Sequence, residues 1–214
     1  MKKYIKLSVF SVKKFIIIYY IVGLIGLSIP YSRNLFIYII PFAILINLFF
    51  ILYFNKNWGS KFVIYSISLC ILGFVAELIG VNTGLIFGNY TYNNSVLGIK
   101  IMNTPLIIGF NWFILIYCTF ILINKLKYPV IIRILIGGLI MLIFDLILEP
   151  VAIKLSMWNW ITDKIPLQNY VAWFLLSCGF IGLLYTARTD IKNVISIHLL
   201  LVQFIFFLGL NLLL

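Results

Sequence analysis

Apolar residues lie along this chain in long runs that are separated by shorter polar segments. Each run holds about 17–22 largely apolar residues, which is the length of helix that crosses roughly 30 Å of hydrocarbon. The pattern therefore predicts about seven transmembrane helices. Their expected ranges are 13–30, 35–54, 62–80, 105–123, 130–149, 167–186 and 193–214.

The composition excludes a soluble protein. Hydrophobic residues make up 64% of the 214 positions and charged residues only 10%. A soluble domain of this size needs far more polar surface than that. We therefore expect an all-α polytopic membrane protein in which residues 1–214 form a single transmembrane domain.

Basic residues are shared unequally between the two sets of loops that these helices create. With the N-terminus in the cytoplasm, twelve lie on the cytoplasmic side and four on the opposite side. The positive-inside rule thus predicts an N-terminus-in protein of the plasma membrane, which is the inner membrane in a bacterium. The net charge of +11 is explained by this anchoring, so nucleic acid is not an expected partner. The cytoplasmic set is Lys2, Lys3, Lys6, Lys13, Lys14, Lys56, Lys61, Lys125, Lys127, Arg133, Arg188 and Lys192, and the opposite set is Arg33, Lys100, Lys154 and Lys164.

Three of the five acidic residues, Glu77, Asp145 and Glu149, lie inside or at the ends of predicted helices. A charged side chain at bilayer depth costs at least a few kcal/mol, so such residues usually have a function. At 1.5 Å per residue, Glu77 lies roughly 22 Å from the inner end of its helix, and Asp145 lies at nearly the same depth. Glu149 shares a face with Asp145, four residues later. Pro150 disfavours helix at the residue before it and predicts that this helix ends at Glu149.

Two long loops are expected at the level of these carboxyl groups. Residues 81–104 are aromatic and punctuated by glycine, which predicts an irregular or re-entrant loop between the third and fourth helices. Non-helical backbone at this depth is tolerated only where protein buries it or where it lines a cavity. Residues 151–169 carry Trp158, Trp160 and Asn169. The candidate site therefore faces the non-cytoplasmic side.

Metal and redox chemistry find little support in the sequence. Cys70, Cys118 and Cys178 belong to three different predicted helices without ligand-like spacing, and His198 is the only histidine. The chain also has no glycine-rich phosphate loop after a strand. We therefore expect neither a metal nor a cofactor.

Several blocks of the sequence, spread over roughly residues 73–176, form an ordered signature. The blocks are Ala76 to Gly84, Phe87 to Tyr92, Leu97-Gly98, Pro105, Trp112, Asp145 to Ala152, and Trp158-x-Trp160 followed by Pro166, Asn169 and Trp173. In this order they resemble a family of carotenoid biosynthesis membrane proteins, which includes the CruF-type carotenoid 1,2-hydratases and the bisanhydrobacterioruberin hydratases. Glu149 stands where many members of this family have Asp.

The resemblance implies a cofactor-independent hydratase that adds water across the terminal C1=C2 bond of an acyclic carotenoid end group. Its partners would be the polyene, the membrane and other enzymes of the pathway. A carboxylic acid must protonate C2, and aromatic faces can stabilise the resulting cation. We expect Asp145 to be the general acid, with Glu77 and Glu149 sharing its proton or orienting water. The expected substrate-binding residues are Trp112, Asn111, Tyr90, Trp158, Trp160, Asn169 and Trp173.

Other functions stay open at this stage. The chain could modify another polyene or isoprenoid end group, act as a small proton-coupled transporter, or serve as a structural subunit of the pathway. The two carboxyl groups on the fifth predicted helix could also pair with Lys154 or cap a helix. A transporter would show inverted repeats, and none is visible in the sequence.

Overall fold

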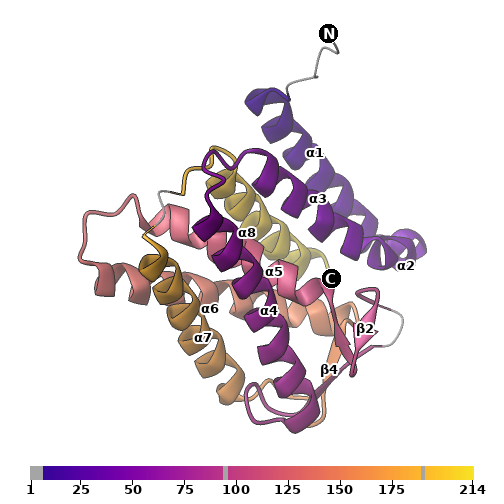
Figure 1. Ribbon diagram of the computed structural model, residues 1–214. Helices are drawn as coiled ribbons and strands as arrows, with labels where there is room; N and C mark the ends of the chain where they lie inside the picture. Colours follow the sequence, from indigo (N-terminus) through magenta and orange to yellow (C-terminus); the bar gives the residue numbers. More distant parts are fainter. Residues whose placement is uncertain (1–6, 94–95, 189–190) are drawn as a thin grey trace.

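The computed structural model describes residues 7–93, 96–188 and 191–214, which form eight helices and four short strands (Figure 1). The helices are α1 (Val9–Ser28), α2 (Pro30–Tyr38), α3 (Ile40–Tyr53), α4 (Ser60–Thr83), α5 (Ile107–Ile123), α6 (Val130–Lys154), α7 (Leu167–Ala187) and α8 (Ser196–Leu213). The strands are β1 (Tyr90–Tyr92), β2 (Lys100–Ile101), β3 (Thr104–Pro105) and β4 (Trp158–Trp160).

The predicted all-α membrane architecture is confirmed, but the predicted count of seven spanning helices is not. By length and composition, five of the described helices could cross a membrane: α1, α4, α6, α7 and α8. A sixth span results if α2 and α3 count as one, although they are bent by 54° at Ile39. Pro41 explains this break, because it has no N–H to bond to the carbonyl of Ile37. The remaining apolar helix, α5, has only 17 residues.

Helix α5 runs through the middle of the bundle, where α3, α4, α6, α7 and α8 all pack on it (Figure 1). Fourteen of its residues are buried. A helix that is apolar on every side and enclosed by other helices has no polar face to present. The sequence run at 105–123 therefore forms the core of the bundle.

The outer surface of the bundle is apolar, whereas polar side chains are buried inside. On α4, for example, Ile64, Ile67 and Ile71 are all more than half exposed. Glu77 on the same helix and Asp145 on α6 are buried. This arrangement is the reverse of that in a soluble protein, and it fits a bilayer as the surrounding solvent.

One end of the bundle gathers the short basic loops. The backbone N–H of Lys56 donates to the carbonyl of Lys192, and His198 at the start of α8 is 3.1 Å from the carbonyl of Lys13 in α1. The hydroxyl of Tyr185 donates to Asn124 in the loop after α5. These contacts place the predicted cytoplasmic loops together, while the side of the membrane on which they lie stays a prediction. Lys2, Lys3 and Lys6 lie outside the described residues.

The other end of the bundle is closed by the two long loops. The segment between α4 and α5, expected to be irregular or re-entrant, carries β1, β2 and β3. Strand β2 pairs with β3, and β1 pairs antiparallel with β4 from the loop between α6 and α7. The two loops are therefore joined by a two-stranded ribbon, β1–β4 (Figure 1).

The prediction that α6 ends at Glu149 is wrong. The helix continues through Pro150 to Lys154. Proline removes the hydrogen bond to Leu146, but it does not forbid helix when packing outweighs that loss. Val151 and Ala152, directly after the proline, are both fully buried, and α6 packs along α7. This packing keeps the last turn helical.

Candidate functional site

The ribbon β1–β4 presents four aromatic side chains on one face. Tyr90 pairs with Trp160, and Tyr92 pairs with Trp158. Because side chains alternate along a strand, these four share a face, and Thr91 between the tyrosines is exposed. The inward face is therefore purely aromatic, with three of its four rings buried and Trp158 half-buried.

Glu77 on α4 accepts three hydrogen bonds from aromatic side chains. The hydroxyls of Tyr90 and Tyr92 donate to Oε2 at 2.6 and 2.8 Å, and the indole N–H of Trp112 donates to Oε1 at 3.0 Å. Glu77 is only 5% exposed. An ionised carboxylate accepts hydrogen bonds without donating any, so this set of three donors matches a carboxylate.

The two tyrosines stay protonated in this environment. Burial, followed by the negative charge of Glu77, raises the pKa of both Tyr90 and Tyr92 well above the ordinary phenol value. Both hydroxyls therefore remain donors to Glu77. The ribbon in this way fixes the orientation of the carboxyl group.

Glu149 on α6 is held by the other half of the ribbon. The indole N–H groups of Trp158 and Trp160 donate to its Oε2 at 3.1 and 2.9 Å. This oxygen therefore bonds to the two indole N–H groups and not to Lys154. Glu149 also lies inside α6, so it does not cap the helix. The structural alternatives of ion pairing and capping therefore do not describe Glu149.

Asn169 on α7 links Glu149 to Asp145. Its amide nitrogen donates to Oδ2 of Asp145 at 2.7 Å and reaches Oε1 of Glu149 at 3.5 Å. Asp145 is fully buried, and its Oδ1 has no hydrogen-bond partner among the described residues. Asn169 therefore connects the two carboxyl groups. We call Asp145 and Glu149 the carboxyl pair.

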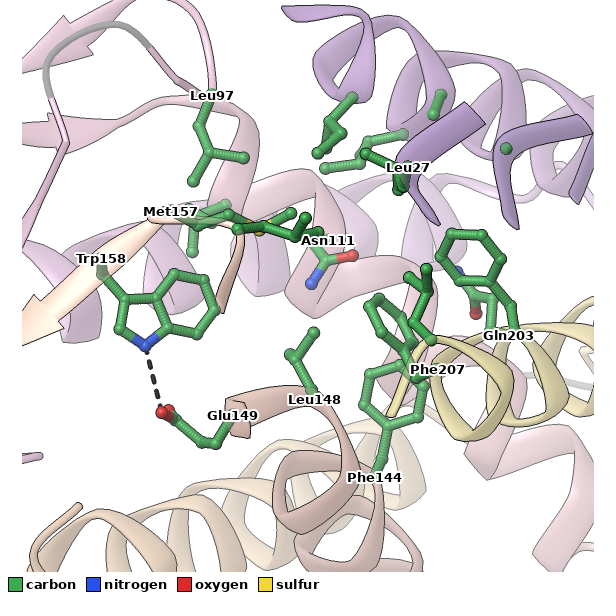
Figure 2. Close-up of a pocket in the computed structure, with 18 of the residues that line it drawn as sticks. Leu27, Leu97, Asn111, Phe144, Leu148, Glu149, Met157, Trp158, Gln203 and Phe207 are labelled. Atoms are coloured by element: carbon green, nitrogen blue, oxygen red, sulfur yellow. Dashed lines mark hydrogen bonds between the residues drawn. The ribbon is translucent and has the colours of Figure 1, made fainter. Parts of the chain in front are cut away.

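An apolar cavity of about 300 Å³ lies next to the carboxyl groups of Glu77 and Glu149 (Figure 2). The residues expected from the sequence that line it are Glu77, Glu149, Tyr90, Asn111, Trp112, Trp158, Trp160, Asn169 and Trp173. Asp145 was expected to be the general acid, but it is not among the described residues of the cavity wall. Its Oδ2 accepts the amide N–H of Asn169, which does line the cavity.

Aromatic rings and one amide complete the wall near the carboxyl groups. Trp112 stacks on Trp173 with ring centroids 4.3 Å apart, and Trp160 lies 5.1 Å from Tyr90. The amide of Asn111 projects into the middle of the cavity (Figure 2). This end of the cavity therefore offers acid groups, π faces and an amide to one bound molecule.

Sequence reasoning missed several polar residues of this cavity. Tyr92 donates to Glu77 as Tyr90 does, and its position two residues later in a strand was the signal that could have found it. Tyr20, Asn47 and Gln203 line the far end of the cavity. They come from three separate helices and have no local pattern in the sequence. In the described residues, no group of three or more His, Cys, Asp or Glu side chains could hold a metal ion.

The fold and the cavity define a polytopic membrane protein with buried carboxyl groups that face an apolar, aromatic pocket. A family model described as "Carotenoid biosynthesis protein" matches residues 35–214. The chain therefore belongs to the carotenoid biosynthesis protein family. No curated protein and no solved structure matches it.

Proposed function

We propose that this carotenoid biosynthesis protein adds water across the terminal C1=C2 double bond of an acyclic carotenoid end group. The observation that carries the proposal is the cavity, where Glu149 and the stacked Trp112 and Trp173 face one apolar space. A long polyene dissolves in the bilayer and can enter a membrane-embedded site. Its end group would meet acid and aromatic groups together.

The carboxyl pair would supply the proton for C2. Two carboxyl groups that lie close together in apolar surroundings do not readily both carry a charge, so such a pair holds a proton near neutral pH. Glu149 lines the cavity, and Asp145, which does not, is connected to it through the amide of Asn169. We therefore assign Glu149 as the acid that contacts the substrate and Asp145 as its proton partner. This assignment exchanges the roles that the sequence suggested for the two residues.

Protonation of C2 leaves a tertiary cation at C1, which the aromatic wall would stabilise. A cation is attracted to the face of an aromatic ring, most strongly to that of tryptophan. Trp112 and Trp160 both line the cavity. Glu77 accepts three hydrogen bonds, as a carboxylate does. Its negative charge would stabilise the positive charge at C1.

Water would then complete the reaction. Asn111 and Asn169 line the cavity and can hold a water molecule through their amides. The water oxygen bonds to C1, and the proton that it loses returns to the carboxylate of the pair. One water molecule is added in total, the product is a tertiary alcohol, and the acid is restored without an oxidant or a reductant.

Expression in a host that accumulates lycopene tests this proposal. We expect a new pigment that is heavier than lycopene by one water molecule, or by two if both ends react. A different mass change would indicate another polyene-modifying enzyme. An unchanged pigment, with the protein present in the membrane, would contradict the proposal and favour a transporter or a structural subunit.

A further inference from the structure

Helices α1 and α3 lie side by side along one edge of the bundle, and contacts close the space beside them at two levels (Figure 1). At one level, Phe15 packs edge-to-face on Phe50 with ring centroids 5.7 Å apart, and the amide of Asn47 hydrogen-bonds the hydroxyl of Tyr20 at 2.7 Å. At the other level, α2 packs on the end of α1, and a Cβ added at Gly26 would collide with the ring of Phe36.

Between these two levels, α1 and α3 are separated by a gap. Among the described residues, a Cβ added at Gly23 would meet only the ring of Phe206 in α8, at 3.4 Å, and no atom of α3 within 4 Å. The facing residues of α1 and α3 line the cavity, so the cavity extends into this gap. We call the gap the window, and the residues on its two sides are Val22, Gly23, Ile40, Ala43 and Ile44.

The window opens on the outer surface of the bundle. Val22 and Ile39 line the cavity and are nevertheless 50% and 40% exposed. At the carboxyl end of the same cavity, Trp112 and Glu149 are only 1% and 2% exposed. Figure 2 shows Leu27 of α1 across the cavity from Glu149. Because the outer surface is apolar, the window connects the cavity with the hydrocarbon of the bilayer.

The size of the cavity shows why an opening matters. A cavity of about 300 Å³ is at the lower end of the range for pockets that enclose a drug-sized molecule. The chain of an acyclic carotenoid is much longer than such a molecule. If one end group lies beside Glu149, most of the chain must therefore lie outside the cavity.

We propose that the end group of the polyene enters from the bilayer through the window, and that the rest of the chain lies in the window during the reaction. This inference rests on the proposed function, because it takes the occupant of the cavity to be a polyene. It adds that the protein recognises one end group at a time and accepts acyclic polyenes with different groups at the far end. The two ends of a symmetric polyene would then react in separate binding events.

Three matched ligands test this inference on the full-length protein in detergent. They are lycopene, a derivative in which a polyethylene glycol chain replaces one end group, and a derivative in which it replaces both. Binding is followed by quenching of tryptophan fluorescence. The derivative with one free end should bind with nearly the affinity of lycopene, because its modified end stays outside the window. The derivative with no free end should not bind.

A reversible plug locates the passage. Ala43→Cys places a thiol in the window, and benzyl methanethiosulfonate attaches a benzyl group to it through a disulfide. Lycopene should then bind about tenfold more weakly or worse, as expected when a side chain occupies the space of another group. A reductant should restore binding, which shows that the variant is folded.

Two controls accompany the plug. Leu45→Cys carries the thiol at an exposed position of the same helix that is not among the described residues of the cavity wall, and its modification should leave binding unchanged. The wild-type protein, treated in the same way, accounts for the native cysteines Cys70, Cys118 and Cys178.

Loss of binding by the derivative with one free end would overturn the inference, and so would full binding by the plugged variant. These assays are separate from the test of the hydration reaction, because binding requires no chemistry. A protein that hydrates polyenes and binds lycopene with the plug in place loses only the window. A protein that the plug blocks but that forms no hydrated product keeps the window and loses the proposed reaction.

Discussion

Both ends of the helical bundle bury polar side chains, but they do so in different ways. At the end with the basic loops, Tyr117 donates to Asn55, and Asn193 bonds both the hydroxyl of Tyr117 and the carbonyl of Ile51. The side-chain oxygen of Asn193 accepts a hydrogen bond from the backbone N–H of Ile195. None of these residues is among the described residues of the cavity wall. This group, Asn55, Tyr117 and Asn193, bonds within the protein and holds helix ends together.

At the opposite end, polar groups face the cavity. Glu77, Glu149 and Asn169 all line it, and Oδ1 of Asp145 has no hydrogen-bond partner among the described residues. The comparison teaches that burial of a polar group alone does not mark a functional site in a membrane protein. What separates the two ends is access to a space that a ligand can fill. The two groups should therefore respond differently to substitution, one through activity and the other through stability.

The largest effect is expected for Glu149→Gln. The amide keeps the size of the side chain but cannot transfer a proton, and positioned acids contribute about 10²–10⁴-fold to a rate. Conversion of pigment should therefore fall by about 100-fold or more, while the protein still inserts. Asp145→Asn should lose activity in the same way. The conversion by both variants is measured in pigment extracts from the polyene-producing host.

Asp163→Asn is the matched control for those carboxyl substitutions. Asp163 is exposed in the loop after β4, and asparagine tolerates its left-handed backbone. This variant should convert pigment as the wild type does. If Glu149→Gln kept half of the wild-type conversion, Glu149 would have no role as the acid.

The next effect is expected at a glycine that supports Trp112. A Cβ added at Gly73 would lie 2.6 Å from the Cβ of Trp112, whereas one added at Gly179 has nothing within 4 Å. Overpacking costs about 1–3 kcal/mol, so Gly73→Ala should lower the unfolding temperature and the activity together. Gly179→Ala should be neutral or slightly stabilising, because alanine favours helix over glycine. If the two variants had the same unfolding temperature and the same activity, α4 would not pack tightly against Trp112.

Asn193→Ala tests the other end of the bundle. It removes the acceptor for the N–H groups of Ile195 and Ser196 at the start of α8, a loss of about 1–2 kcal/mol by analogy with helix N-caps. Thermal unfolding in detergent should show this loss, while activity per folded molecule stays at the wild-type level. Asn34→Ala, at an exposed position of α2, should change neither quantity. A loss of specific activity in Asn193→Ala would remove the distinction between the two ends.

The smallest effect is expected for Tyr92→Phe, which removes one of three donors to Glu77. A single hydrogen bond contributes about 1 kcal/mol, so activity should fall about fivefold. Because the pKa of Tyr92 is raised, the hydroxyl stays protonated, and the ratio of variant to wild-type activity should be constant from pH about 7 to about 10. The exposed Tyr38 provides the control as Tyr38→Phe. A ratio that changes with pH in this range would mean that Tyr92 titrates.

The helices and the depth of the acidic residues follow from local features of the sequence. Apolar runs predicted most of the helices to within about five residues, although the run at 35–54 forms two helices that are bent at Ile39. The rise per residue predicted that Glu77 and the carboxyl pair belong to one end of the bundle. All seven candidate substrate-binding residues line the cavity. The positions of these residues could be predicted because they depend on spacing within a single helix or loop, whereas their roles in binding stay a prediction.

What the sequence could not give depends on long-range contacts. Strands β1 and β4 have only three residues each, and their pairing joins residues that are 66 to 70 positions apart. The continuation of α6 past Pro150 depends on packing against α7, and the far end of the cavity depends on the meeting of α1, α3 and α8. The exchange of roles that we propose for Asp145 and Glu149 likewise rests on which of the two lines the cavity.

The most direct measurement of the central claim is hydration by the purified protein in isotopically labelled water. The account predicts that the product carries one oxygen from the solvent at C1 and, in heavy water, one deuterium at C2. Both labels should be absent from pigment incubated with Glu149→Gln. A product whose oxygen does not come from water, or pigment that stays unchanged with folded wild-type protein, would contradict the account.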